Sequence, residues 1–424
     1  MKNILLFGAG KSATCLIDYL ITESQVHNWF LTVVDNNLEL AKSKTKQAPH
    51  TSAISINVED DITRKKLISN SDIVISLLPP ALHFLVAYDC VELNKNLLTA
   101  SYVDEKIKNI EKKITENKLL FLCEMGLDPG IDHMSAMELI HRIKHEGGEI
   151  TSFKSHTGGL VAPESDDNPW HYKISWNPRN VVLAGAAGAV YKEAGKIINK
   201  PYPSLFEGCI EINVKKIGNL AYYPNRDSLS YIPVYELESA STFIRTTLRY
   251  PAFCKAWKAV VAAGLTDDKK FIDADKLSFK KWASPVVPYI TEDISIPMQF
   301  LGLFDERPVP LSAKTSADVL QYLLETKLAM QPQDKDMIVM VHELEYILQN
   351  KRNYLRSSLV TQGEDNIRTA MAKTVGLPLG IAAKLILLGK ITLTGLHIPI
   401  LPEIYNPVLA ELKKHHIHFE EELN

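Results

Sequence analysis

The sequence has few cysteines for its length: 424 residues contain five, and no two of them stand in a C-x-x-C arrangement. An odd number of scattered cysteines argues against a disulfide framework and against a zinc site, so we expect reduced thiols and no metal centre. An excess of basic residues is also absent, because the formal net charge is -3. This balance is ordinary for a globular protein and gives no reason to expect a nucleic-acid partner.

Long apolar runs are lacking as well. None approaches the roughly 20 residues that cross a bilayer, since even GLPLGIAAKLILLGKI carries Lys384 in its middle. The N-terminal MKNILLFGAG ends its short apolar run in glycines, which is typical of a strand and not of a signal peptide. We therefore expect a soluble, cytoplasmic protein with no membrane contact. The sequence shows no internal repeat or low-complexity tract.

What is present before residue 125 is an alternation of short β-rich runs with helical ones. Such βαβ repetition predicts a parallel sheet, and six strands fit into this stretch. Runs such as IVISLL are apolar on both faces, as a sheet covered by helices on each side requires. The predicted fold class is therefore α/β, with a Rossmann-type doubly wound parallel sheet.

After residue 150 the regular alternation of strands and helices ends. The stretch from Thr151 to Asn180 predicts a long loop, which the aromatic residues Trp170, Tyr172 and Trp176 should keep ordered. Residues from about 255 to 330 predict a small helical lobe, and DMIVMVHELEYIL predicts a return to sheet. TAMAKTVGLPLGIAAKLILLGKI predicts a helix broken at Gly-Leu-Pro.

A dinucleotide site is indicated by FGAGKSA, which follows the first strand and opens a helix as G-x-G-x-x-A at Gly8, Gly10 and Ala13. The glycines allow a tight turn and close approach to a pyrophosphate, while the helix N-terminus supplies free N–H groups. Asp35 ends the second strand, where an acidic residue binds the ribose hydroxyls. Together these features predict dinucleotide binding.

Asp35 also predicts which dinucleotide binds. Its carboxylate can accept a hydrogen bond from a ribose 2′-hydroxyl, whereas a 2′-phosphate would meet a like charge. NAD is therefore favoured over NADP, although Lys42 and Lys44 follow within two helical turns. A solvent-exposed loop aspartate with no such role is the alternative.

A substrate crevice is expected where the fourth, fifth and sixth strands end, in SLLPP, ASY and GLDPG. Ligands of open α/β sheets bind beyond the carboxyl ends of the strands. Asp132 is expected to cap a helix that begins at His133. Asp128 precedes a proline, which disfavours helical geometry, so its carboxylate is the better candidate for chemistry. The residues expected to line this crevice are Leu77, Leu78, Pro79, Ser101, Tyr102 and Asp128.

Several runs spread over nearly the whole chain resemble saccharopine dehydrogenase of the glutamate-forming type, also called saccharopine reductase. They are GLDPGIDHMSAM, GGLVAPESDDNPWHYKISW, YPNRDS, RTTLRY, KDMIVM and AMAKTVGLP. The resemblance implies a Rossmann domain at residues 1–127, completed by helices from about 366–424. It further implies an α/β substrate-binding and dimerisation domain at 128–254 and about 334–365, and a helical lobe at 255–333. Because the chain starts at the first strand, the monofunctional form is expected. The resemblance alone implies a homodimer.

The resemblance also implies the reaction: saccharopine, NAD and water give glutamate, 2-aminoadipate 6-semialdehyde and NADH, in lysine metabolism. The preference for NAD favours the direction of lysine breakdown. Saccharopine carries three carboxylates, and arginine matches a carboxylate through two parallel hydrogen bonds. Arg245, Thr247 and Arg249 share one face if FIRTTLRYP is a strand. Each arginine alone could equally form a structural ion pair; the resemblance favours Arg226 and Arg249 as ligands.

The resemblance places two groups of residues. Around the dinucleotide it implies Gly8, Gly10, Lys11, Ser12, Ala13, Asp35, Asn57, Val58, Leu77, Leu78, Pro79, Ser101, Leu127, Asp128 and Pro129. Around saccharopine it implies Ser101, Tyr102, Asp128, Thr157, Ser175, Arg226, Thr247, Leu248 and Arg249.

The expected catalytic residues are Asp128 and Tyr102. Asp128 is the predicted base, or the group that positions the secondary amine while hydride leaves the neighbouring carbon. The family has a cysteine in Y-C-G-G where this sequence reads H-T-G-G, so Thr157 replaces the thiol. A water held by Thr157, or His156, could substitute, although an ordinary core histidine is the simpler interpretation of His156.

Two other functions are compatible with the same pattern. One is dehydrogenation of a related secondary amine such as carboxynorspermidine, which has fewer carboxylates; the arginines and the APESDDNP run favour saccharopine. The other is a non-catalytic NAD-binding sensor, against which Asp128, Arg226 and Arg249 argue. Fold alone does not separate these functions.

Overall fold

The computed structural model describes residues 1–423, which fold into two compact units. Unit 1 contains Met1–Arg142 and Ala370–His418, and unit 2 contains Ile143–Thr369 and the residues from Phe419 on. The predicted fold class is confirmed: one unit is built on a parallel sheet and the other on a mixed sheet. The predicted three-part division of the chain stays a prediction.

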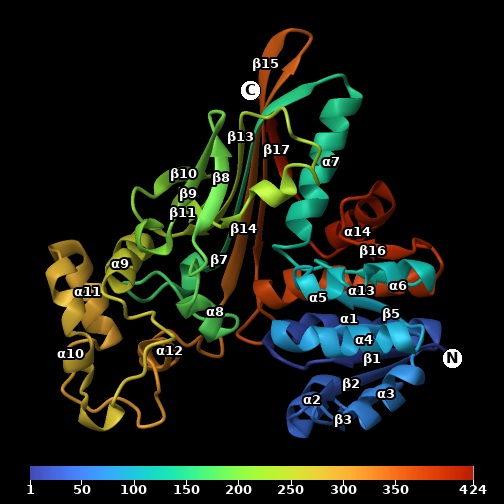
Figure 1. The fold of residues 1–424 in the computed structure, drawn as a ribbon, viewed down its shortest axis with the longest axis horizontal. Helices are drawn as coiled ribbons and strands as arrows, with labels where there is room; N and C mark the ends of the chain where they lie inside the picture. The colour runs from blue at the N-terminus through green and yellow to red at the C-terminus, as the bar shows by residue number, and fades with distance from the viewer. Residues whose placement is uncertain (424) are drawn as a thin grey trace. The chain divides into compact units, whose positions relative to one another are not determined.

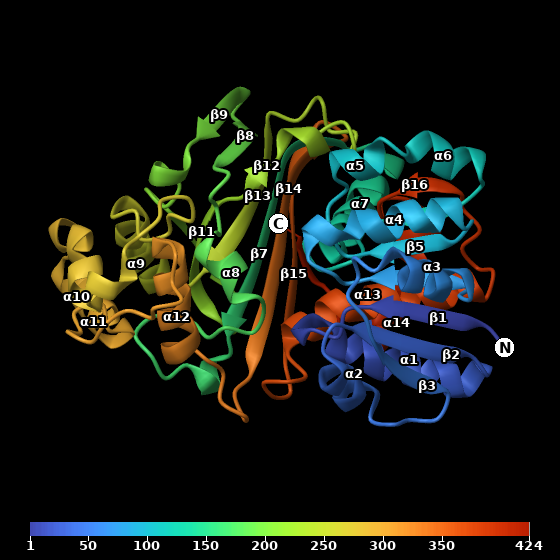
Figure 2. The same cartoon turned by 60° about the horizontal axis from the view of Figure 1, so that its bottom comes forward.

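Unit 1 is built around a seven-stranded parallel sheet of order β16-β6-β5-β4-β1-β2-β3 (Figure 2). Six of the strands precede residue 125, as predicted, and the seventh, β16, comes from the C-terminal part and was not predicted. The strands are β1 (Asn3–Phe7), β2 (Phe30–Asp35), β3 (Thr51–Ser55), β4 (Ile73–Ser76), β5 (Asn96–Thr99), β6 (Leu120–Leu122) and β16 (Gly395–His397).

Helices cover both faces of this sheet, because the strand side chains are apolar on both sides. On one face, strand residues such as Leu5 and Val74 pack with residues of α3, α4, α5 and α6, while α1 and α13 cover the other. The helices are α1 (Thr14–His27), α2 (Leu38–Thr45), α3 (Asp61–Ser69), α4 (His83–Glu92), α5 (Glu105–Lys108), α6 (Glu111–Glu116), α7 (Ile131–His145), α13 (Ala370–Leu387) and α14 (Pro402–Lys414).

Helix α13 corrects the predicted break at Gly-Leu-Pro, because it runs unbroken with Pro378 inside it. Gly376 and Gly380 let it approach α1 closely: a Cβ at Gly376 would lie 2.9 Å from the backbone nitrogen of Leu16, and one at Gly380 would lie 2.6 Å from the Tyr19 ring. By length and composition α13 could cross a membrane, but 72% of it is buried inside the protein. Its apolar character therefore serves the core of unit 1.

Unit 2 is built around a ten-stranded sheet whose main path is β10-β11-β13-β7-β14-β15-β17, with the long strands side by side in Figure 1. Strand β7 covers Glu149–Val161, so the loop predicted from Thr151 begins only after Val161. A Cβ at Gly158 would lie 2.7 Å from the Leu248 carbonyl oxygen, so this glycine allows the strands to approach. The other strands are β8 (Ala189–Glu193), β9 (Lys196–Lys200), β10 (Ile210–Val214), β11 (Gly218–Pro224), β12 (Arg226–Asp227), β13 (Thr242–Arg249), β14 (Asp336–Leu348), β15 (Lys351–Gln362) and β17 (Glu420–Leu423).

The sheet of unit 2 curls, because residues from opposite ends of the strand order meet. Arg356 on β15 donates a hydrogen bond to the carbonyl oxygen of Asn213 on β10 at 2.5 Å. The curl encloses a small apolar cluster on one face of the sheet, in which Leu160, Leu248 and Val339 are buried.

The other face of the unit 2 sheet packs against the predicted helical lobe, shown in yellow and gold in Figure 1. Trp170 and Tyr172 of the long loop are buried in this core, as expected for an ordered loop. The Trp170 indole N–H donates to the Pro297 carbonyl oxygen at 2.7 Å. The helices are α8 (Pro178–Val182), α9 (Pro251–Ala262), α10 (Phe279–Trp282), α11 (Glu292–Leu301) and α12 (Ser316–Lys327).

Candidate functional site

The glycine-rich turn after β1 has the geometry of a pyrophosphate cradle. Gly8 has φ of +102°, and a Cβ there would lie 2.7 Å from the Leu77 carbonyl oxygen, so only glycine fits. A Cβ at Gly10 would meet no atom within 4 Å, so there is open space where the helix begins. No side chain caps this start, so its N–H groups can bind an anion. The turn fits a dinucleotide.

The two glycines should therefore respond differently to alanine. Gly8→Ala is expected to destabilise unit 1 by about 1–3 kcal/mol, because the methyl group meets backbone at a left-handed φ. Gly10→Ala should keep the fold but weaken dinucleotide binding tenfold or more, because the methyl group occupies the open space. Urea denaturation and fluorescence titration measure the two effects; equal loss of stability in both variants would contradict this assignment.

The remaining predicted cofactor residues of unit 1 lie at one edge of its sheet. They follow the carboxyl ends of neighbouring parallel strands, where ligands of such sheets bind. After β3 come Asn57 and Val58, after β4 come Leu77, Leu78 and Pro79, after β5 comes Ser101, and after β6 come Leu127, Asp128 and Pro129. In the glycine-rich turn Lys11 is exposed, Ser12 is half-buried and Ala13 is buried.

Asp35 is engaged with the backbone around it. One carboxylate oxygen accepts from the Ala9 N–H at 2.8 Å and the other from the Asn37 N–H at 2.9 Å. The carboxylate thus ties the glycine-rich turn to the end of β2.

Asp128 and Tyr102 meet in unit 1, and both are half-buried. The Tyr102 hydroxyl donates to Asp128 Oδ1 at 3.3 Å. The Gly-Leu-Asp-Pro-Gly turn is tight, since a Cβ at Gly130 would overlap the Gly126 carbonyl oxygen. Helix α7 begins at Ile131 and not at His133, and Asp132 accepts from the Gly130 N–H at 2.6 Å. Asp132 therefore shapes the turn, and Asp128 is the carboxylate beside the tyrosine.

One residue of this edge was not predicted. His83 opens α4, is 5% exposed, and joins Ser76 at the end of β4 to Ser101 after β5. Its Nδ1 lies 2.8 Å from Ser76 Oγ and its Nε2 lies 2.7 Å from Ser101 Oγ. The sequence signal that could have identified His83 is its place at the start of a helix, seven residues after the serine that ends a strand.

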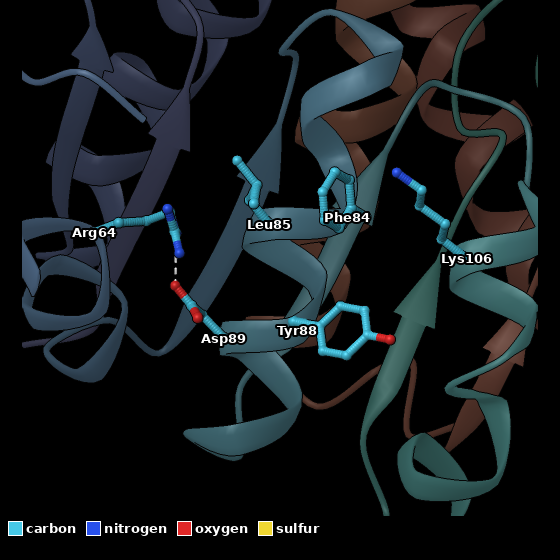
Figure 3. Close-up of a pocket in the computed structure, with 6 residues that line it drawn as sticks. All are labelled: Arg64, Phe84, Leu85, Tyr88, Asp89 and Lys106. Carbon is cyan, nitrogen blue, oxygen red and sulfur yellow. Dashed lines mark hydrogen bonds and ion pairs between the residues drawn. The ribbon is translucent and has the colours of Figure 1, made fainter. Parts of the chain in front are cut away.

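A pocket of about 360 Å³ lies elsewhere on unit 1, over α3, α4 and α5 (Figure 3). Arg64 Nε donates to Asp89 Oδ2 at 2.6 Å at one side of it, and Lys106 lies 3.7 Å from the centre of the Phe84 ring at the other. The charged groups that line it are therefore already paired within the chain. None of the predicted site residues lines this pocket.

In unit 2, Arg249 is a buried cation with no carboxylate in ion-pair distance among residues 1–423. It is 5% exposed; its Nη1 donates to the Leu248 carbonyl oxygen at 2.8 Å, and its Nε has no hydrogen-bond partner in that part of the chain. Its guanidinium carbon lies 5.3 Å and 5.6 Å from the ring centres of Tyr172 and Phe253. A buried charge without a counter-ion is costly unless a ligand supplies one.

Thr157 and Thr247 lie on the same sheet face as Arg249. Strand β13 pairs Thr247 with Thr157 on β7 and with Tyr223 on β11, and side chains alternate between the two faces. Thr157 Oγ1 is buried and has no hydrogen-bond partner within the described chain. Ser175 is buried three residues beyond Tyr172 in the adjoining loop. Two unsatisfied polar groups therefore share one face.

Arg245, Leu248 and Arg226 lie in different places relative to Arg249. The face shared by Arg245, Thr247 and Arg249 is confirmed by strand β13, and Arg245 stacks 4.5 Å above the Tyr231 ring. Leu248 points to the opposite face, into the apolar cluster, so its side chain does not join Arg249. Arg226 is exposed on β12, next to Asn225, whose N–H donates to the Arg245 carbonyl oxygen. That position is four residues, roughly 13 Å along a strand, from Arg249.

His156 lies on the apolar-cluster face, in a buried polar network and not beside Thr157. Its Nδ1 lies 2.7 Å from Thr246 Oγ1 and its Nε2 lies 3.2 Å from Glu343 Oε2. Burial lowers the pKa of His156, so its neutral ring donates to Glu343. Burial also opposes ionisation of Glu343, but hydrogen bonds from His156 and Tyr354 outweigh it and lower the pKa of Glu343 to about 2. His156 is therefore a satisfied core histidine.

This network predicts an acid-dependent loss of stability. A carboxyl group whose pKa falls on folding stabilises the protein above its unfolded pKa of about 4.3, and that stability is lost as pH falls toward the folded pKa. Glu343→Gln should cost on the order of 2 kcal/mol at pH 7 and roughly half of that at pH 3, which lies between the unfolded and the folded pKa. Glu345→Gln, at an exposed position on the same strand, is the control. Urea unfolding at both pH values measures this; an equal cost at both would contradict it.

Comparison with known proteins decides the family. The model of the saccharopine dehydrogenase NADP binding domain matches residues 4–122, and that of the saccharopine dehydrogenase C-terminal domain matches residues 126–417. The chain belongs to the saccharopine dehydrogenase family. It is 32% identical over 445 residues to saccharopine dehydrogenase (NADP+, L-glutamate-forming) of Saccharomyces cerevisiae, with 99% of each chain covered. The predicted resemblance is thus confirmed.

Some relatives are about twice as long as this chain. Mitochondrial alpha-aminoadipic semialdehyde synthase of Bos taurus is 34% identical over 97% of this chain, but the chain spans only 47% of that protein. Among solved structures, apo saccharopine dehydrogenase (L-Glu forming) of S. cerevisiae matches all of both chains with a TM-score of 0.89 and 32% identity. Homospermidine synthase of Legionella pneumophila, at 10% identity and a TM-score of 0.60, shares the fold.

The family membership corrects the predicted preference for NAD over NADP. The full-length fungal relatives of S. cerevisiae, Pyricularia oryzae and Schizosaccharomyces pombe are all named as NADP+ enzymes, and the matching family model is an NADP binding domain. The prediction took the charge of Asp35 as the deciding feature, whereas the carboxylate accepts hydrogen bonds from the Ala9 and Asn37 N–H groups and so has a structural role in the turn. The inferred direction of lysine breakdown rested on the same preference and loses its support.

Proposed function

We propose that this protein is an NADP-dependent saccharopine dehydrogenase of the L-glutamate-forming type. The reaction oxidises the secondary amine of saccharopine, and hydrolysis of the imine gives glutamate and 2-aminoadipate 6-semialdehyde. The names of the full-length relatives support the substrate and the dinucleotide. The glycine-rich turn, with open space at Gly10, supports dinucleotide binding.

The observation that carries the proposal is the buried Arg249 guanidinium without a carboxylate partner in the described chain. Arginine is matched by a carboxylate or phosphate, and saccharopine offers three carboxylates. The rings of Tyr172 and Phe253, whose centres lie 5.3 Å and 5.6 Å from the guanidinium carbon, are within cation–π distance of it. The unsatisfied Thr157 hydroxyl on the same face is a further group available to the substrate.

Unit 1 supplies the proton chemistry. Asp128 accepts a hydrogen bond from Tyr102 at Oδ1, and its carboxylate is the group that takes the amine proton or holds the amine in place. Tyr102 orients this carboxylate and shares its charge. Gly8, Gly10 and the residues after β3 to β6 would hold the dinucleotide, which would supply the hydride acceptor.

A rate assay with both dinucleotides and in both directions tests the proposal. We expect saccharopine-dependent reduction of NADP+ with a kcat/KM at least tenfold above that for NAD+, and oxidation of NADPH by glutamate with the semialdehyde. Carboxynorspermidine is the control substrate, since it has fewer carboxylates. Turnover of carboxynorspermidine but not of saccharopine would contradict the proposal.

Assembly follows from the resemblance alone. A homodimer is part of the proposal, and sedimentation velocity measures it. The cytoplasmic location stays a prediction from the sequence.

A further inference from the structure

His83 lies between two serine hydroxyls at the ligand edge of unit 1. Ser76 is fully buried at the end of the central strand β4, and Ser101 is half-buried after β5. The imidazole contacts both, at 2.8 Å through Nδ1 and at 2.7 Å through Nε2. Burial lowers the pKa of His83 to about 4, so the ring is neutral near pH 7 and has one donor and one acceptor nitrogen.

Ser76 decides which nitrogen carries the hydrogen. In residues 1–423 its hydroxyl has one hydrogen-bond partner, His83 Nδ1. If Nδ1 carried the hydrogen, the buried Ser76 O–H would be left without an acceptor, which is unfavourable. If Ser76 donates to Nδ1, that donor is satisfied and the hydrogen of the ring lies on Nε2. The Nε2–H then donates to Ser101 Oγ.

This arrangement leaves the hydrogen of the Ser101 hydroxyl available to a ligand. The backbone of Ser101 is held on both sides, because its N–H donates to Thr99 Oγ1 at 3.2 Å and its carbonyl oxygen accepts from the Glu124 N–H at 3.1 Å. With its oxygen accepting from His83, Ser101 can only donate its own hydrogen outward. Such a fixed O–H group matches an anionic acceptor such as a carboxylate.

We propose that His83 is a positioning residue that holds the Ser101 hydroxyl as a hydrogen-bond donor to a carboxylate of the substrate. The proposal rests on the proposed function, which supplies an amino-acid conjugate with several carboxylates. His83 itself does not touch the reacting atoms. It acts by fixing the direction of one hydrogen.

Two substitutions separate this role from a structural one. Asparagine places its amide near the position of Nδ1 and keeps the contact to Ser76, whereas glutamine places its amide near Nε2 and keeps the contact to Ser101. His83→Asn should raise the KM for saccharopine about tenfold, as Ser101→Ala should, with kcat for saccharopine oxidation within about twofold. His83→Gln should stay within about threefold of the natural protein. The double variant His83→Asn with Ser101→Ala should be no worse than either single variant.

The opposite results overturn the proposal. Three results would each show that His83 does not act through Ser101 on the substrate. The first is a rise in KM in the double variant that equals the product of the two single rises. The others are a changed dinucleotide Kd with unchanged KM, and equal losses in the Asn and Gln variants. Imidazole ¹⁵N shifts of the natural protein give a second readout that needs no turnover, with His83→Gln identifying the signal. We expect hydrogen on Nε2; hydrogen on Nδ1 overturns the proposal. If saccharopine is not turned over, the proposed function fails, and the ¹⁵N result still decides the His83–Ser101 assignment.

Discussion

Replacing Asp128 with asparagine is expected to lower kcat for saccharopine oxidation by about 10²- to 10⁴-fold, the range that a positioned general base contributes. The amide keeps the shape of the side chain but cannot take a proton from the amine. The Gly126–Gly130 turn and the Asp132 contact to the Gly130 N–H do not depend on this carboxylate, so the fold should remain. Steady-state kinetics with circular dichroism as the folding check measures the effect.

Two variants control for that experiment. Tyr102→Phe removes one hydrogen bond to Asp128 Oδ1 and should cost about tenfold, because the carboxylate loses its orientation but not its basicity. Asp104→Asn changes an exposed carboxylate that caps α5, and asparagine caps as well as aspartate, so full turnover is expected. Full turnover of Asp128→Asn with an unchanged pH profile would remove Asp128 from the mechanism.

Replacing Arg249 with methionine should separate binding from stability. The KM for saccharopine is expected to rise about 100-fold, since truncating one partner of a buried charge pair costs roughly 2–5 kcal/mol. The unliganded protein should melt at a higher temperature, because the buried cation has no carboxylate partner in the described chain and methionine fills similar space. Kinetics and thermal melting of the same preparation measure both effects.

Arg249→Lys and Arg245→Met complete this comparison. Lysine keeps the charge but lacks the planar fork, so its KM should also rise. Arg245, buried on the same strand, stacks on Tyr231, and its loss should lower the melting temperature with a smaller effect on KM. An unchanged KM for Arg249→Met would show that another group binds the substrate carboxylate.

Local sequence patterns predicted the fold correctly where a structural feature depends mainly on neighbouring residues. The alternation of apolar β-rich runs with helices placed six strands of unit 1, and a glycine at φ +102° stands where the turn motif requires one. Strand periodicity placed Arg245, Thr247 and Arg249 on one face. These features depend on neighbours in sequence, so the sequence alone was enough.

The errors arose where the structure depends on contacts between residues far apart in the sequence. Strand β16 has three residues and is defined by pairing with β6. Helix α13 continues through Pro378, and its glycines pack against α1. The cofactor prediction considered Asp35 only as a ribose ligand, whereas its carboxylate also binds the turn at Ala9, a contact that no spacing rule contains. His83 was missed because its role depends on two serines brought together by the sheet.

The central claim, that the buried Arg249 guanidinium binds a substrate carboxylate, is tested most directly by removing the two partners separately and together. Saccharopine and three analogues, each with one carboxylate replaced by a methyl group, are titrated calorimetrically into the natural protein and into Arg249→Met, both with NADP+. We predict that one analogue binds the natural protein about 100-fold more weakly than saccharopine does. In Arg249→Met, the same analogue and saccharopine should bind with equal affinity. If every analogue loses the same affinity in both proteins, Arg249 does not bind a carboxylate of the substrate.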